Sequence, residues 1–450
     1  MTQSAVSAGD TAWVLISSAL VLLMTVGLAF FYGGLVRPKN ALNTAMMSIV
    51  ALGLIGVQWV LGGYSLAFAP GLPWIGGLEW IGFRGVGLDP DPTYSAAIPQ
   101  QAHAMFQGMF AIITPALISG AIVERMRFRA YVVFLLLWAT LVYDPLAHWV
   151  WGAGGWLLTL GALDFAGGTV VHLSAGVSAL VAAIMLGPRK EYGRAALVPH
   201  NVPFVLLGAG LLWFGWFGFN AGSALAANGV AALAFVNTNT AAAAALVTWA
   251  ALDVLRSRKV TAVGAATGAV VGLVGITPAA GYVTPIAAIF IGLICAGISH
   301  TAIQIRSKSR LDDSLDVFSC HGLAGMAGAL LTGVFATKAA NPGGADGLLA
   351  GNPGQMVVQL VAVAAAVAIS AVGTIGILVL VKATVGLRSS VREELTGLDL
   401  SEHGEEAYFG TGILTTPGVA LGDSVIVTTA PPVPHPSPSP ARPASGAATP

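Results

Sequence analysis

Two histidines, His172 and His321, stand in the middle of long apolar stretches of the sequence. An imidazole surrounded by hydrocarbon needs a hydrogen-bonding partner or a polar cavity. Its neutral form donates from one ring nitrogen and accepts at the other, so two such rings in contact can guide a small polar solute, or a proton, through an apolar tube. Structural histidines bonded to backbone carbonyls are an alternative. A metal site is another, although no third ligand is evident.

The two histidines open the same short pattern, His-x-x-Ala-Gly. Alanine and glycine are common here, so the match alone is weak evidence of a repeat. It gains weight because the copies fall in the fifth and tenth apolar stretches. Five is an odd number, so the two halves of the chain would cross a membrane in opposite directions. That arrangement is an inverted repeat, whose functional site lies near the middle of the membrane.

Acidic residues precede both of these stretches. Asp164 lies just before the fifth, where its carboxylate can accept the free N–H groups of a helix start. A direct role with a cation is an equally good interpretation, and the two are compatible. Asp316 precedes the tenth stretch, and capping is its expected role.

Aromatic residues are concentrated in and after the third, fourth and sixth stretches: Phe106, Phe110, Trp149, Trp151, Trp156, Trp216, Phe217 and Phe219. For most of them we expect the aromatic belt of a membrane interface. An aromatic cage for a small monovalent cation is the sharper alternative, since a desolvated cation over a tryptophan face gains about 2 kcal/mol. Ser223 would add a hydrogen-bond acceptor to such a cage.

The composition indicates that most of the chain is solvated by lipid. Of 450 residues, 56% are hydrophobic and only 9% are charged, against about 25% charged in soluble domains. A net charge of zero gives no basic surface for nucleic acid. We predict an all-α polytopic membrane protein with eleven spans, since each span needs about 20 apolar residues. The spans are 11–33, 41–69, 100–123, 130–149, 165–187, 203–226, 231–255, 260–279, 284–305, 317–337 and 356–385.

The basic residues predict the orientation of these spans. Every Lys and Arg except Arg84 and Lys338 falls in alternate connections or at the carboxyl end of the chain, from Lys382 onward. By the positive-inside rule, the N-terminus lies outside and the C-terminus in the cytoplasm. An odd number of spans, arranged as a five-plus-five repeat with an extra last helix, agrees with this orientation.

Three regions follow from these patterns. Residues 1–385 form the eleven-span domain, and residues 386–410 form a polar cytoplasmic segment that docks on it. Residues 411–450 are rich in Pro, Ser and Ala, and we expect them to be disordered because such a composition cannot bury a core.

Five segments of the chain carry a resemblance to a known family: Phe31–Arg37, Asp164–His172, Gly215–Ser223, Asp316–Gly322 and Gly397–Glu405. Over residues 10–410, the sequence resembles the ammonium transporter (Amt/Mep/Rh) family, and within it the Amt branch. The segments are long and occur in the family's order, so the resemblance is specific. Residues after about 410 match no pattern of the family.

The resemblance implies a homotrimer in the cell membrane in which each protomer has its own pore. It implies roles for nine residues: recruitment of ammonium at Phe110, Trp151 and Ser223, a gate of Phe106, Phe110 and Phe219, a pore lined by Trp216, a relay at His172 and His321, and support from Asp164. Ammonium would lose its proton, NH3 would cross the pore, and the proton would move separately. Methylammonium would be an analogue of the substrate. The resemblance implies no enzyme activity, cofactor or metal, and it makes a PII signal protein a candidate cytoplasmic partner.

Two other functions remain open within the resemblance. An Rh-like channel would pass neutral NH3 or CO2 without charge movement, but Trp151 with Ser223 favours the Amt branch, because Rh members generally lack that cation site. An ammonium sensor would signal through a domain after the last span. The residues there have no domain-like hydrophobic pattern, so the sensor is the weaker alternative.

Overall fold

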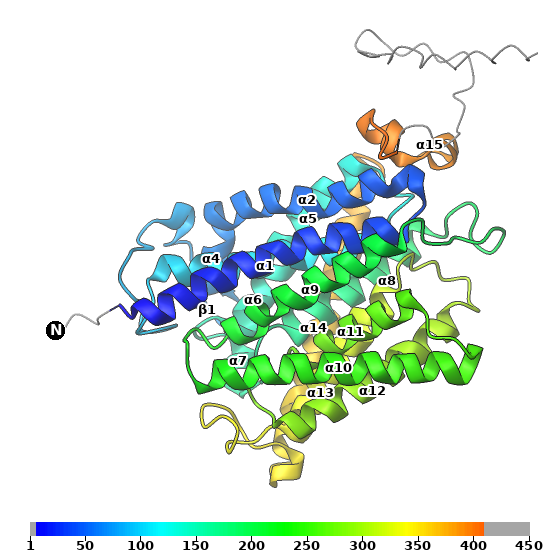
Figure 1. Ribbon diagram of the computed structural model, residues 1–450. Helices are drawn as coiled ribbons and strands as arrows, with labels where there is room; N and C mark the ends of the chain where they lie inside the picture. Colours follow the sequence, from blue (N-terminus) through cyan, green and yellow to red (C-terminus); the bar gives the residue numbers. More distant parts are fainter. Residues whose placement is uncertain (1–5, 409–450) are drawn as a thin grey trace, which may run out of the picture. The chain divides into compact units, whose positions relative to one another are not determined.

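The computed structural model describes residues 6–408, and they form a bundle of long helices (Figure 1). Within residues 6–408, ten helical runs are long and apolar enough to cross a membrane, and α11 is a shorter apolar helix between two of them. The prediction of an all-helical polytopic protein is confirmed. The runs and α11 begin and end within a few residues of the predicted spans, except that the fourth run continues to Leu160.

The spans are built from these elements: α1 (Ala8–Leu35); η1 (Pro38–Asn40), α2 (Ala41–Gln58), η2 (Trp59–Gly63) and α3 (Tyr64–Phe68); α4 (Gln100–Ile118) and η4 (Ser119–Ala121); α5 (Phe128–Trp138), η5 (Ala139–Tyr143), α6 (Asp144–Trp151) and α7 (Trp156–Leu160); η6 (Gly168–Leu173) and α8 (Ser174–Leu186); α9 (Val202–Gly222); α10 (Gly229–Ser257); α11 (Ala262–Ile276); α12 (Pro285–Arg306); η7 (Phe318–Leu323) and α13 (Ala324–Phe335); α14 (Gly354–Thr384). Elements between and after the spans are β1 (Gly71–Leu72), which pairs antiparallel with β2 (Ile75–Gly76), η3 (Ile81–Phe83), η8 (Leu348–Ala350), α15 (Val391–Thr396) and η9 (Asp399–His403).

Both histidines lie in wide π-helical turns. His172 belongs to η6 and His321 to η7, and each turn continues directly into an α-helix. Such turns are rare and frequently occur at functional sites. The two turns give the histidines equivalent places at the start of their spans.

A carboxylate caps each of these turns from eight positions before its histidine. The Asp164 carboxylate accepts the N–H groups of Gly167, Gly168, Thr169 and Val170 at 2.6–3.0 Å. The Asp313 carboxylate accepts those of Val317 at 3.0 Å and Phe318 at 2.8 Å. Both caps hold a helix start whose N–H groups lack partners within the helix.

The predicted cap at Asp316 is therefore wrong. Asp316 forms an ion pair with Arg306 at 2.5 Å and has a left-handed backbone, with φ of 60°. In the other copy, the position five residues before the histidine is Gly167, with φ of 105°. The backbone turns in the same way at both places, so the side chain of Asp316 points away from the N–H groups that it was expected to cap.

The glycine of each His-x-x-Ala-Gly pattern lets the two histidine segments cross at close range. A Cβ atom on Gly176 would overlap the backbone of Gly322, the residue after His321. A Cβ atom on Gly325 would lie 2.9 Å from the backbone nitrogen of Leu173, the residue after His172. The pattern is thus a requirement of the crossing, with each glycine facing the backbone beside the other histidine.

The helix α15 lies at one end of the bundle (Figure 1). Ionic side chains join the connections between spans at this end. Buried Glu124 accepts from Arg37 at 2.9 Å and from Arg189 at 2.5 Å, and Arg189 also contacts Asp312 at 2.8 Å. These four residues come from four different connections between spans. The network therefore fixes the connection that holds Asp312 and, next to it, the cap Asp313.

The segment after the last span packs on this end of the bundle. Asp399 accepts the N–H groups of Leu42 at 3.0 Å and Asn43 at 2.7 Å, and Leu398 donates to the Asn40 side chain at 2.8 Å. By its contacts, the chain through Ala407 is one compact unit. The expected disorder of residues 411–450 lies outside the described residues.

We predict that Gly176→Ala prevents folding or disrupts the crossing at a cost of at least about 3 kcal/mol, because its methyl group meets backbone that cannot repack. The yield of folded protein recovered from membranes measures the effect. Gly210→Ala is the matched control, since no described atom lies within 4 Å of a Cβ there. A normal yield of folded Gly176→Ala would contradict the close crossing.

We predict that Glu124→Gln lowers the free energy of unfolding by about 3–5 kcal/mol, because it leaves buried arginines without their charge partner. Burial alone would raise the pKa of Glu124, but Arg189 and Arg37 outweigh it and lower the pKa from 4.5 to about 2. Stability from this lowered pKa is present above pH 4.5 and is lost as the pH falls towards 2. Thermal unfolding of detergent-solubilised protein across this range should show the loss in the wild type. The same loss of stability in Glu124→Gln would contradict the assignment of this pH dependence to Glu124. Glu191→Gln, at the more exposed partner of Arg37, is the control.

Candidate functional site

The two histidines meet at the centre of the site. Their Nδ1 atoms are 3.3 Å apart, and the ring centroids are 5.4 Å apart with 25° between the planes. One Nδ1 must donate and the other accept, so one of the two Nε2 atoms is an acceptor and the other a donor. The rings bond to each other rather than to backbone carbonyls, which argues against two structural histidines.

The Nε2 atom of His172 is buried and has no hydrogen-bond partner within the described chain. A buried polar atom left unpaired costs about 1–3 kcal/mol, so it calls for a solute or another explanation. Within residues 6–408, no three His, Cys, Asp or Glu side chains are grouped as metal ligands. The free nitrogen is therefore available to a small hydrogen-bonding molecule.

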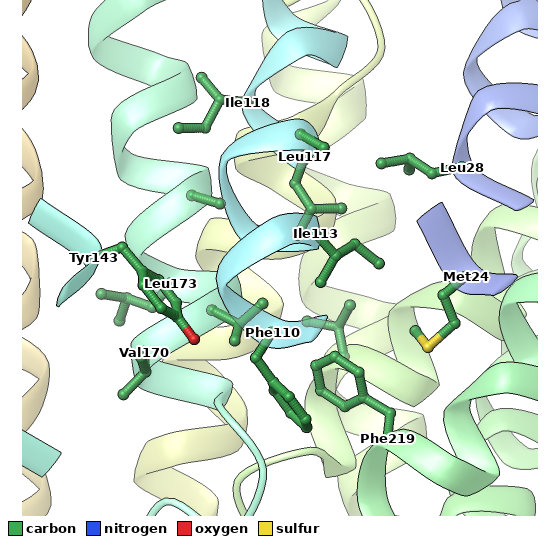
Figure 2. Close-up of a cluster of buried hydrophobic side chains, with 14 of the residues drawn as sticks. Met24, Leu28, Phe110, Ile113, Leu117, Ile118, Tyr143, Val170, Leu173 and Phe219 are labelled. Carbon is green, nitrogen blue, oxygen red and sulfur yellow. The ribbon is translucent and has the colours of Figure 1, made fainter. Parts of the chain in front are cut away.

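A small apolar cavity adjoins the pair. Its lining is Met24, Leu28, Phe31, Tyr32, Ile113, Leu117, Val171, His172, Leu212, Trp216, Phe219, Val270 and His321. Figure 2 shows part of this wall, with Ile113 and Leu117 on one side and Met24 and Leu28 on another. The cavity volume of ≈ 10 Å³ is about the room that one water-sized molecule needs. Almost every atom that faces such a molecule is carbon, so the histidines are its main polar contacts.

Aromatic rings close one side of this cavity. The Phe110 and Phe219 centroids are 4.3 Å apart, and both rings are buried (Figure 2). Phe106 packs on Phe110 at 5.0 Å, and Phe219 lies 5.8 Å from the His172 ring. The Phe110 and Phe219 pair is in contact, so a molecule that passes here must move these rings.

Trp216 forms a wall beside His172. The rings stack with centroids 5.2 Å apart and 21° between their planes. The indole N–H donates to the Thr277 hydroxyl at 2.9 Å, so this polar group already has its partner. Thr277 was not singled out from the sequence, where a threonine at the end of an apolar stretch gives no functional signal.

Trp151 and Ser223 lie beyond the phenylalanines. The Trp151 ring packs edge-on against Phe110 at 6.0 Å, and both Trp151 and Ser223 are partly exposed. The Ser223 hydroxyl donates to the Phe219 carbonyl at 2.8 Å, so its oxygen keeps free lone pairs. The structure thus connects Trp151 to the Phe110 ring and Ser223 to the Phe219 backbone.

Asp164 is buried and positions two parts of the site, Trp151 and the turn that contains His172. Its two carboxylate oxygens are occupied by the four N–H groups at the start of η6, and its carbonyl accepts from the Trp151 indole at 2.9 Å. Of the two interpretations left open by the sequence, these contacts support capping. Through them, Asp164 holds both Trp151 and the turn that contains His172.

Some predicted aromatic residues lie away from this site. Trp149 and Trp156 cluster with Trp74, with centroids 5.5–6.0 Å apart, and Phe217 stacks on Phe235 at 4.0 Å. None of them contacts the histidines in the described chain. They agree with the interface-belt interpretation rather than the cage.

A larger cavity of ≈ 500 Å³ adjoins His321 on the other side of the pair. Its lining includes Tyr192, Arg306, Asp316 and Cys320. His321 lines both cavities, whereas His172 lines only the small one. The order of the groups is therefore Trp151, the phenylalanines, His172, His321 and then the larger cavity.

Comparison with known proteins agrees with this geometry. The family model described as Ammonium Transporter Family matches residues 12–408. The chain is 51% identical over 401 residues to an ammonium transporter of Bacillus subtilis, covering 89% of this chain and 98% of the relative. This chain belongs to the ammonium transporter family. The predicted family is confirmed, and the chain is a multi-pass transporter of the cell membrane rather than an enzyme.

Two further relatives support the assignment. An ammonium transporter of Aquifex aeolicus is 49% identical over 412 residues, covering 90% of this chain and 95% of the relative. The crystal structure of Mep2 from Saccharomyces cerevisiae superposes with a TM-score of 0.80 at 39% identity, covering 86% of this chain and 88% of that one. The match therefore extends over nearly the whole described chain.

Proposed function

We propose that this member of the family transports ammonium by deprotonating it. The protein recruits the cation, passes NH3 along the two histidines and moves the proton separately. The observation that supports this proposal is the contact between His172 and His321 in an apolar cavity behind two phenylalanines. The Nε2 atom of His172 has no partner within the described chain. An electrogenic Amt-type transporter is the function that this geometry supports best.

Recruitment takes place at Phe110, Trp151 and Ser223. Aromatic faces attract a monovalent cation, and the Ser223 oxygen accepts one of its hydrogen bonds. Methylammonium fits the same chemistry. Asp164 supports the site through its carbonyl bond to Trp151 rather than by direct charge contact.

Deprotonation follows from the nature of the cavity. A bare ammonium ion among carbon atoms would lose its hydration without compensation, whereas NH3 carries no charge. Potassium has no proton to give up, so the same step excludes it. The gate of Phe106, Phe110 and Phe219, beside Trp216, separates recruitment from the histidine pair. The acceptor Nε2 of the pair takes up the proton that ammonium gives up and relays it, while NH3 passes on as the neutral molecule.

The arrangement of the two halves supports an inverted five-plus-five repeat with an extra last helix. Asp164 and His172 in one half correspond to Asp313 and His321 in the other, and the glycines that face them correspond as well. With the basic residues on the cytoplasmic side, the N-terminus lies outside and the C-terminus inside. Residues 1–385 are then the transporter domain, and residues 386–410 its docked cytoplasmic segment.

The assembly that we propose is a homotrimer in the lipid bilayer, with a pore in each protomer, as the family resemblance implies. A PII signal protein is a candidate partner at the face where Asp399 docks. The runner-up function is an Rh-like neutral channel. It predicts a site without cation recruitment, which Trp151 against Phe110 does not favour.

We predict a transient current when liposomes that contain the purified protein receive a pulse of ammonium chloride, and none with potassium chloride.

Replacing both His172 and His321 by leucine should abolish this charge-coupled selectivity, because the relay and the polar contacts are gone. Intact NH3 flux without current in the wild type would assign the protein to the neutral channels. Wild-type ammonium currents in the double variant, with potassium still excluded, would contradict the relay.

We predict that Trp151→Leu raises the half-saturating ammonium concentration by up to about 30-fold, the equivalent of about 2 kcal/mol of cation–π attraction. Protein stability should change less. Trp149→Leu is the matched control, because that ring packs on Trp74 instead of Phe110. An unchanged half-saturating concentration in Trp151→Leu would show that recruitment occurs elsewhere.

A further inference from the structure

The last span, α14, carries a glutamine whose amide is almost entirely buried. Gln359 is 1% exposed. Its Oε1 accepts the N–H of Leu163 at 2.8 Å, and its Nε2 donates to the carbonyls of Leu163 at 2.8 Å and Ala329 at 2.9 Å. Both N–H bonds of the amide and its oxygen are therefore used.

These contacts lead to both histidine segments. Leu163 precedes Asp164, which holds the Trp151 indole and caps the turn of His172. Ala329 lies on α13, the helix that continues the turn of His321. One side chain from a third span thus bonds to the backbone ahead of one histidine and to the helix behind the other.

The surroundings are arranged for this amide. Gln355, one turn earlier, donates to the Gly161 carbonyl at 3.0 Å and lies 3.4 Å from the Gln359 oxygen. Gly333 on α13 leaves room for it, since a Cβ there would lie 3.0 Å from Gln359 Cγ. An apolar side chain would fill the same space without the cost of burying an amide in a membrane. The polar residue is explained by the backbone atoms that it fastens.

We propose that Gln359 is a positioning residue for ammonium recruitment, which fixes the Leu163–Asp164 backbone and hence Trp151, while setting the distance between the two histidine segments. The proposal deepens the proposed function and rests on Trp151 as the recruitment site. It gives the extra last helix a role in the pore of its own protomer.

The test is the half-saturating ammonium concentration for currents in liposomes that contain the full-length protein. Gln359→Met, which keeps the length of the side chain, should raise it about tenfold through the loss of the buried hydrogen bonds to Leu163 and Ala329. In the double variant with Trp151→Leu, no rise beyond that of Trp151→Leu alone should occur, because both act on the same contact. Thr374→Val is the control. It removes a buried hydrogen bond between α14 and Trp138 but leaves the contacts of α14 with the Leu163–Asp164 backbone in place.

Any other result overturns the proposal. If Trp151→Leu raises the half-saturating concentration and Gln359→Met lowers only the melting temperature, Gln359 has a structural role only. The same conclusion follows if the effects of the two substitutions on the half-saturating concentration add fully in the double variant. If Trp151→Leu itself has no effect, the assignment of the recruitment site is wrong, and so is the role proposed for Gln359. Should Gln359→Met not fold, Gln359→Glu, which keeps the acceptor for Leu163, is judged by the same criterion. Misfolding of both variants shows a folding role only.

Discussion

A polar group inside hydrocarbon must find a partner, and the structure depends on how His172 and His321 meet this constraint. Each ring satisfies one nitrogen of the other at 3.3 Å, which leaves the outward-facing nitrogens for a solute. Their contact requires two helices to cross beside the rings. The crossing requires glycine at positions 176 and 325, where any side chain would meet backbone. The pattern that first marked the histidines in the sequence is therefore the geometric condition for their meeting.

Fixed elements hold this pair in register. Asp164 and Asp313 cap the two turns in equivalent ways, and the network around Glu124 anchors the connection next to Asp313. Gln359 reaches both segments from the last span. Since the cavity holds about one small molecule, small displacements of either ring would change what it binds. A rigid frame around a narrow apolar passage is what selection of NH3 over ions requires.

The spans were predictable because hydrocarbon demands about 20 apolar residues in a row, and the histidines because charge and polarity are rare there. The π-helical turns were not, since hydropathy carries no signal for one extra residue per turn. Proximity misled the choice of Asp316: the spacing of eight residues between Asp164 and His172 points to Asp313 instead. Gln359 was overlooked, although a glutamine in an apolar span is the kind of signal that marked the histidines.

The central claim is that ammonium crosses as NH3 with its proton carried separately. Its most direct test is the ratio of charge to nitrogen, measured in one preparation of proteoliposomes from integrated current and labelled methylammonium uptake. The account predicts one elementary charge moved for each nitrogen delivered, with none moved by potassium. Delivery of nitrogen without charge would contradict it, and so would a matching current carried by potassium.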